Sequence, residues 1–264
     1  NIFTSFLYCG QIKPNYRGLV TLLHFNGNVW DSAKNYYWEF VGTTTYKPDG
    51  IYDKAGEFTW LSYVRKNNWT INNPKGNSGP YWWSGGITVC AWLKPKSKGI
   101  GNSQYYEIIY YGNENTIGNL NQQAQGFLGI FRGNYSSNHK LIVRNNYNNF
   151  VSSGCDYQLF EAYFSTPSAG QEDPWFHFAM VIDYSNRQYR LYKNGNIFEI
   201  RDTPYAITFS SWSGYGQIGT SDYWNPTNTW ARYMDEFAIF NVPLTDIEIK
   251  EIYSKTSGRY INTE

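Results

Sequence analysis

Short apolar runs that end in turn-forming residues recur along almost the whole chain. Residues 19–25 are followed by Asn26-Gly27, and residues 87–93 lie between Gly85-Gly86 and Pro95. Runs of this length, rich in β-branched and aromatic residues, are typical of strands that end at turns. The same pattern occurs in four further segments, at residues 108–111, 127–131, 140–143 and 176–183. The chain is therefore predicted to consist of many short strands.

The clearest local signal is a hairpin at residues 187–200. Asn194-Gly195 separates two strand-like arms, and this pair favours a type I′ turn because both residues tolerate positive φ. Apolar and polar side chains alternate in the first arm, residues 187–193. This alternation predicts an antiparallel strand with one buried face.

One helix is predicted, close to the C-terminus. Thr245 can cap it, and Glu248 three residues later completes a capping box. Leu244 and Ile249 have the spacing of a hydrophobic staple, and Ile252 continues the apolar face. A short amphipathic helix is expected to pack against the strands.

These signals together predict an all-β fold, an antiparallel two-sheet β-sandwich (jelly roll) with one short C-terminal helix. The 264 residues suit one large sandwich, and no internal repeat is present. Residues 1–17 are expected to form an N-terminal arm or linker, and residues 18–264 the sandwich domain.

Several motifs occur in a fixed order along the chain: LLHFNG at 22–27, GIYDKAGEF at 50–58, ITVCAWLKP at 87–95, WFHFAMV at 175–181 and MDEFAIF at 234–240. In these motifs and in their order, the chain resembles the laminin-G-like jelly-roll domains of the concanavalin A-like lectin/glucanase superfamily. The resemblance implies the sandwich fold and a role in glycan binding, adhesion or as an accessory domain, because members of the family differ in function.

Aromatic residues make up 20% of the chain, with 11 Trp and 25 Tyr. A sugar ring has apolar C–H faces and polar edges, so an exposed aromatic ring beside polar groups suits it. Many of these rings must simply pack, and the resemblance places Trp92 and Trp175 at strand positions of the family, where they are expected to be structural. Residues 36–38 and Trp69 are secondary candidates for a ligand site. The main candidate carbohydrate-binding residues lie in two predicted loops: Tyr81, Trp82, Trp83, Tyr223, Trp224 and Trp230.

The resemblance also implies a possible structural Ca²⁺, held near the last strand and an early loop. Asp235 and Asp31 occupy the corresponding positions, and Ca²⁺ takes six to eight oxygen ligands. The alternative is that Asp235 accepts backbone hydrogen bonds at a strand end and that Asp31 caps a turn.

The sequence does not predict catalysis. Glucanases of the superfamily use a Glu-x-Asp-x-x-Glu motif, and no Glu of this chain has an Asp two residues later. Asp235 and Glu236 are adjacent, so in a regular strand they would face opposite sides. His177 lies in an apolar strand, where a hydrogen-bonded structural histidine is expected.

Charge and hydropathy exclude two further classes of partner. The net charge of +1, with scattered Lys and Arg, does not favour nucleic acid binding. No run of about 18 apolar residues is present, so membrane insertion is not expected. The pairing of Cys9, Cys90 and Cys155 stays undecided, because one disulfide or three thiols are equally compatible with the sequence.

The sequence therefore predicts a non-catalytic module that recognises a glycan or glycoconjugate, in an extracellular or virion-surface protein. The alternative is a structural subunit of a virion, such as a capsid, tail or fibre protein, that contacts other subunits and has no glycan ligand. A glycoside hydrolase is a disfavoured third possibility.

Overall fold

The computed structural model describes fifteen parts of the chain: residues 12, 16–33, 36–42, 45–58, 63–66, 85–95, 104–107, 109–112, 127–133, 138–146, 157–165, 174–183, 185–202, 215–219 and 232–257. Within them lie one helix and 18 strands. The strands are β1 (Leu19–Leu23), β2 (Trp30–Asp31), β3 (Tyr36–Tyr37), β4 (Glu39–Val41), β5 (Thr45–Lys47), β6 (Ala55–Phe58), β7 (Tyr63–Lys66), β8 (Gly86–Pro95), β9 (Gln104–Glu107), β10 (Ile109–Gly112), β11 (Phe127–Gly133), β12 (Asn138–Asn146), β13 (Tyr157–Ser165), β14 (Phe176–Asp183), β15 (Gln188–Lys193), β16 (Asn196–Asp202), β17 (Tyr215–Gly219) and β18 (Arg232–Phe240), and the helix is α1 (Asp246–Thr256).

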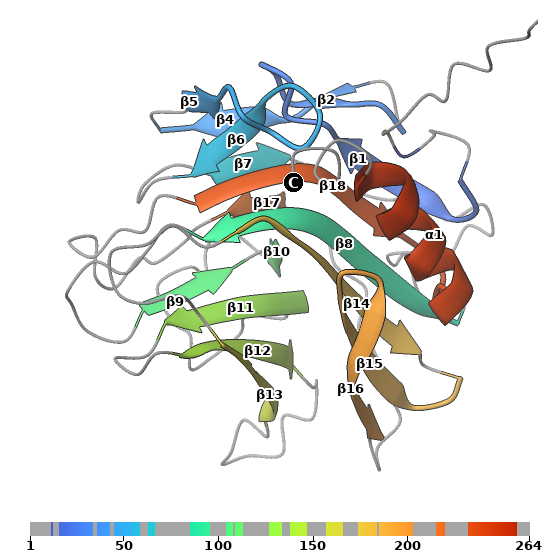
Figure 1. The fold of residues 1–264 in the computed structure, drawn as a ribbon. Helices are drawn as coiled ribbons and strands as arrows, with labels where there is room; N and C mark the ends of the chain where they lie inside the picture. Colours follow the sequence, from blue (N-terminus) through green and yellow to red (C-terminus); the bar gives the residue numbers. More distant parts are fainter. Residues whose placement is uncertain are drawn as a thin grey trace, which may run out of the picture.

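The strands form one large sheet and two smaller ones, and all their pairings are antiparallel. The ten-stranded sheet has the order β16-β15-β14-β8-β18-β1-β2-β3, with β6 joined to β18 and β5 to β6. The four-stranded sheets have the orders β10-β17-β7-β4 and β13-β12-β11-β9, and β11 lies beside β10. Figure 1 shows β8 and β18 side by side through the middle of the molecule, with α1 on one side. The predicted antiparallel sandwich with one short helix is confirmed.

The main core fills the space between the large sheet and the sheet that contains β7 and β17. Alternate residues of the central strands of the large sheet point into it, because successive strand side chains face opposite sides. Val64 of β7 and Ile218 of β17 are fully buried in the same cluster. The central strands contribute Val20, Leu23, Ile87, Val89, Ala91, Leu93, Phe176, Phe178, Met180, Ile182, Leu191, Met234, Phe237 and Ile239.

The opposite face of the large sheet is buried as well, and α1 covers it. Ile249 and Ile252 pack with Cys90 and Val181, which alternate along their strands with the residues of the main core. Both faces of β14 are therefore out of water, and all eight of its residues are buried. Burial on two sides explains why the runs at 87–93 and 176–183 are nearly continuous in apolar residues.

The described residues of the predicted N-terminal arm lie against this second core. Ile12 is 4% exposed. The Tyr16 ring meets the Phe240 ring edge-on, with centroids 6.0 Å apart. Arg17 donates two hydrogen bonds of 2.8 Å to the Glu248 carboxylate of α1. At these positions, the chain before β1 helps to hold the helix on the sheet.

The helix begins as its sequence predicts. Glu248 donates its backbone N–H to the Thr245 hydroxyl, and the Glu248 carboxylate accepts from the Thr245 backbone N–H at 2.8 Å. Leu244 and Ile249 are both fully buried in the same cluster. The capping box and the staple are confirmed, and together they set the start of α1 and its approach to the sheet.

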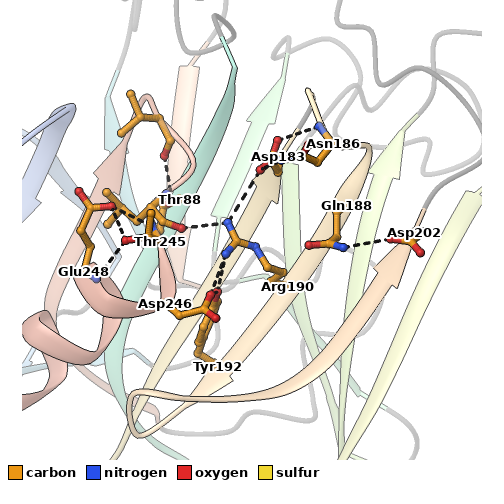
Figure 2. Close-up of polar contacts among 12 residues, drawn as sticks. Thr88, Asp183, Asn186, Gln188, Arg190, Tyr192, Asp202, Thr245, Asp246 and Glu248 are labelled. Atoms are coloured by element: carbon orange, nitrogen blue, oxygen red, sulfur yellow. Dashed lines mark hydrogen bonds and ion pairs between the residues drawn. The ribbon is translucent and has the colours of Figure 1, made fainter.

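Arg190 of β15 ties the start of α1 to the sheet, as Figure 2 shows. Its Nη1 donates to Asp246 Oδ1 at 2.8 Å and to the Tyr192 hydroxyl at 3.0 Å. Its Nη2 donates to the Leu244 carbonyl at 3.0 Å and lies 3.9 Å from Asp183 Oδ2. One guanidinium thus joins a sheet strand to the first turn of the helix.

The predicted hairpin is also present. Asn194 and Gly195 have φ of 51° and 73°, as a type I′ turn requires. Asn194 additionally fastens the turn to β14, since its side-chain oxygen accepts from His177 N at 2.9 Å and its N–H donates to the His177 carbonyl at 2.8 Å. Among the described residues, no helix is both long and apolar enough to span a membrane.

Candidate functional site

The six predicted carbohydrate-binding aromatics lie outside the described residues, as do Trp69, Cys9 and Cys155. The strands that follow the two aromatic clusters, β8 and β18, are antiparallel neighbours in which Arg232 pairs with Pro95 and Phe240 with Thr88. The strands therefore start at opposite ends of the sheet. Gly86 and Pro95 are about 30 Å apart along β8 at 3.3 Å per residue.

Asp31, a predicted metal ligand, is the last residue of β2 and is fully buried. Its Oδ1 accepts the N–H of Leu22 and of Ala33, each at 3.0 Å. Its Oδ2 accepts the indole N–H of Trp38 at 3.2 Å. The carboxylate thus joins β1, the turn after β2 and the residue after β3, which is more than capping a turn.

Asp235, the second predicted ligand, lies fully buried at an irregular point of β18. Its Oδ2 accepts the N–H of Ile51 at 2.7 Å and of Tyr52 at 3.1 Å, and its Oδ1 accepts the N–H of Glu236 at 2.8 Å. Burial raises the pKa of Asp235 well above its ordinary value, and the Glu236 charge raises it further, whereas the backbone donors oppose the rise. Asp235 fixes the segment before β6 to the central strand.

Glu236 was not singled out in the sequence, yet it is buried beside Asp235. The pairing register of β18 shifts between Asp235 and Ala238, and Glu236 has φ of 48°, so the strand bulges here. The regular strand that the expectation assumed for these two adjacent residues is therefore interrupted at this point. Two successive acids inside an apolar run were the available signal, because a regular buried strand has no place for both.

The Glu236 carboxylate contacts Ile12, which precedes β1, and His24, which follows it. Its Oε1 lies 2.7 Å from Nδ1 of His24, and its Oε2 accepts the Ile12 N–H at 3.4 Å. Burial raises the pKa of Glu236, and the hydrogen bond and charge of His24 partly offset this rise. The two neighbouring acids of the bulge are thus both engaged in holding the fold.

The donor sets of Asp31 and Asp235 do not fit a Ca²⁺ ion. All four of their carboxylate oxygens accept hydrogen bonds from N–H groups. These donors lie where a bound cation would have to lie. The described residues contain no group of three or more His, Cys, Asp or Glu that could hold a metal. Calcium binding by Asp31 and Asp235 stays a prediction that this geometry does not favour.

His177 lies on the helix-covered face, where it is 1% exposed. Its ring is 5.5 Å from the Trp92 ring and 6.0 Å from the Tyr253 ring, and neither ring nitrogen has a hydrogen-bond partner among the residues that the structure describes. Burial lowers the pKa of His177 to about 3. The buried position is as expected, and no described residue supplies the expected hydrogen bond of the ring. A buried, neutral imidazole of this kind is not arranged for proton transfer.

A pair of aromatic rings lies at the surface on β2 and β3. Tyr37 is 63% exposed, and it is the one exposed aromatic side chain among those that the structure describes. It pairs with Trp30 across the ribbon, with ring centroids 4.5 Å apart and ring planes at 64°. Trp38, the next residue, is 3% exposed. Of the secondary candidates at 36–38, the structure thus separates an outward Tyr37 from an inward Trp38.

The fold and these surfaces define a lectin-like β-sandwich. A laminin-G-like family, described as the concanavalin A-like lectin/glucanases superfamily, matches residues 70–250. This is well over half of the chain. The chain belongs to this family, and the resemblance seen in the motifs is confirmed. Among curated protein sequences, none matches this chain.

Solved structures with a similar fold include binding domains of botulinum neurotoxins and of a mosquitocidal protein. The binding domain of botulinum neurotoxin DC in complex with rat synaptotagmin II is 14% identical with a TM-score of 0.60, over 90% of this chain and 51% of that one. The binding domain of Paraclostridial Mosquitocidal Protein 1 is 15% identical with a TM-score of 0.59, over 89% and 52%. A structure of botulinum neurotoxin type C is 13% identical with a TM-score of 0.60, over 90% of this chain and 51% of that one; its cell entry depends on interaction with two ganglioside molecules. At these identities the likeness is one of fold, and this chain spans about half the length of each.

Proposed function

We propose that this chain is a carbohydrate-recognition module without catalytic activity, in a protein that acts outside the cell. Its membership of a lectin-like family over residues 70–250 is the observation that carries the proposal. The likeness in fold to toxin binding domains, one of which interacts with gangliosides, supports a glycoconjugate as the ligand. The engagement of Asp235 and Glu236 in structural hydrogen bonds supports a role that is not hydrolytic.

The proposed ligand contacts are the aromatics at 81–83 (Tyr81, Trp82 and Trp83) and at 223–230 (Tyr223, Trp224 and Trp230). Because β8 and β18 start at opposite ends of the sheet, we treat the two clusters as separate candidate sites. An aromatic ring next to amide and carboxylate groups binds a sugar by stacking on its C–H face while the polar groups bind its hydroxyls.

A glycan array tests the proposal directly. The purified chain is applied to printed neutral and sialylated oligosaccharides, once with calcium and once with a chelator. We expect selective binding to a few related glycans, and a loss of about ten-fold in affinity for Trp82→Ala or Trp224→Ala. Ile247→Ala is the matched control, because Ile247 of α1 is 79% exposed and lies in neither cluster.

The opposite outcomes are equally informative. Absence of binding across the array would overturn the proposal and favour the structural alternative, a subunit that contacts other proteins of a larger assembly. Binding that disappears with the chelator would restore calcium as a ligand-site metal, which the donor sets of Asp31 and Asp235 do not favour.

A further inference from the structure

His177 is an ionisable side chain that the fold buries without a described polar partner. It lies on β14 and is 1% exposed. Neither of its ring nitrogens has a hydrogen-bond partner among the residues that the structure describes. A neutral imidazole has one N–H donor and one acceptor nitrogen, and burying such groups unpaired destabilises a fold. His177 therefore carries a cost that an apolar residue in its place would not carry, even at neutral pH.

Two aromatic rings from different elements lie against this imidazole. Trp92 of β8 pairs with His177 across the two strands, and the ring centroids are 5.5 Å apart. The Tyr253 ring of α1 is 6.0 Å from the imidazole and is stacked on the Trp92 ring at 5.7 Å. Trp92 is 1% exposed, whereas Tyr253 is only partly buried. Of the three rings, the one carried by α1 is therefore the one in contact with solvent.

The two ends of α1 are held in different ways. The N-terminal end has the capping box at 245–248 and the hydrogen bonds from Arg190 of β15. At the C-terminal end, the Trp92 indole N–H donates to the Thr256 hydroxyl at 2.8 Å, next to the stacked rings. By contrast, β14 is paired along its whole length with β8 and is also paired with β15. The last turns of α1 can therefore leave the sheet at a smaller cost than β14 can.

Among the described residues, no charge on the neighbouring elements offsets the burial of the imidazole. Asp235 of β18 lies beyond Trp92, because Trp92 pairs with His177 on one side and with Asp235 on the other. Lys193 of β15 has its Nζ 5.5 Å from the centroid of the Phe176 ring. The other titratable groups on the flanking parts of these elements are Cys90 and Lys94 of β8, Tyr192 of β15, and Lys250, Glu251, Tyr253 and Lys255 of α1. Burial lowers the pKa of His177 to about 3, without a contribution from any of these groups.

We propose that the C-terminal half of α1 is an acid-released lid over His177. A protonated imidazole cannot stay charged and unpaired inside the fold, so it must be hydrated. Lifting Tyr253 and the last turns of α1 away from Trp92 hydrates it while the paired strands stay in place. The released state brings His177 and Trp92 into water, so acid opens a surface that is closed at neutral pH. This device does not depend on the proposed glycan binding.

Hydrogen exchange of the wild type at pH 7 and at pH 5 tests the release. The open form takes up a proton with the ordinary pKa of 6.5, and the closed form does so only with the pKa of about 3. The equilibrium constant for opening should therefore rise about 25-fold between the two pH values. We expect the amides of residues 252–257 to lose protection by this factor, after correction for the intrinsic pH dependence of exchange.

Two controls accompany the measurement. His177→Phe cannot take up a proton at this position, so the extra loss of protection at pH 5 should disappear in this variant. The amides of β12, which is paired with β11 and with β13, should keep their protection in both proteins.

Three results would overturn the proposal. Unchanged protection of residues 252–257 in the wild type would show that acid does not release the helix. An equal loss in His177→Phe would assign the effect to another group, such as Asp235. An equal loss in β12 would show that the whole fold opens.

A measurement on the wild type alone decides the case if His177→Phe does not fold. The chain has three histidines, so the imidazole signals can be followed one by one in a pH titration by NMR. We expect one ring to titrate well below pH 6.5. Ordinary titration of all three rings would overturn the proposal.

Discussion

Among single residues, His177 connects burial to the pH dependence of stability. The imidazole lies between the Trp92 and Tyr253 rings, and its backbone is paired with Asn194. Because the ring is buried and no described residue offers it a polar partner, the protonated form is disfavoured in the folded state, and the pKa falls from 6.5 to about 3.

The first prediction follows from the sign of this shift. Between pH 6.5 and pH 3 the unfolded chain binds a proton at His177 and the folded chain does not, so this residue makes the fold less stable as the pH falls. Its contribution lowers the free energy of unfolding by about 2 kcal/mol between pH 7 and pH 5. Urea unfolding of the wild type and of His177→Phe at both pH values measures it. Equal losses in the two proteins would contradict the prediction.

The second prediction concerns Asp235 and its three backbone donors. Asp235→Ala leaves the N–H groups of Ile51, Tyr52 and Glu236 buried without an acceptor, so we expect a loss of about 2–5 kcal/mol in the free energy of unfolding. Asp235→Asn keeps one oxygen acceptor and should lose less. Unfolding is followed with and without calcium. A stabilisation of the wild type by calcium that is lost in both variants would show that Asp235 binds metal instead.

At the level of secondary structure elements, α1 is held by contacts of unequal strength. Arg190 is 14% exposed at its side chain and binds Asp246, the Tyr192 hydroxyl and the Leu244 carbonyl. Arg17 is 53% exposed at its side chain and binds only Glu248 among the described residues. A partly buried guanidinium that satisfies a backbone carbonyl contributes more than an exposed ion pair.

The third prediction compares these two arginines. Arg190→Ala should lower the free energy of unfolding by roughly 1–3 kcal/mol. We expect a value in the lower part of this range, because solvent screens the ion pair with Asp246, which is largely exposed. Arg17→Ala is the matched control and should cost less than about 1 kcal/mol. Chemical denaturation at low and at high salt measures both. A larger effect of Arg17→Ala would mean that the N-terminal segment, and not β15, holds the helix.

The elements differ in how far the sequence predicts them. The capping box at 245–248 and the Asn-Gly turn at 194–195 depend on neighbouring residues, so their geometry follows from local chemistry. The bulge at Asp235-Glu236 depends on partners from Ile12, His24 and residues 51–52, which are far away in the sequence. No local rule could specify it.

For the whole molecule, the strand order bears on the proposed ligand surfaces. β8 and β18 are antiparallel neighbours and start at opposite ends of the sheet. Residues 81–83 precede β8 in the sequence, and residues 223–230 precede β18. We therefore expect two separate ligand surfaces, which together could contact more than one sugar of a branched or repeated glycan.

The fourth prediction concerns independence of the two loop clusters. Substitutions at separate sites that share no partner usually have additive effects. If the two clusters form separate sites, as proposed, the double variant Trp82→Ala with Trp224→Ala should change the free energy of glycan binding by the sum of the single changes, within roughly 0.5 kcal/mol. Calorimetric titration of the four proteins provides the values. A coupling much larger than this would show that both aromatics contact one sugar ring.

The sequence by itself determined several of the long strands, the hairpin, the helix and the family, because each depends on periodicity or on residues that are close together in the chain. It also indicated Asp31 and Asp235 as important, although their role as metal ligands remains a prediction. The tertiary structure decided which side chains are in water: Trp38 is buried and Tyr37 exposed, although they are adjacent and chemically alike. It also decided that the carboxylates of Asp31 and Asp235 hold backbone N–H groups. The reason is that exposure and hydrogen bonding depend on which distant segments lie against a residue. Contacts between residues more than 200 positions apart, such as those of Glu236 with Ile12 and His24, cannot be read from a local sequence pattern.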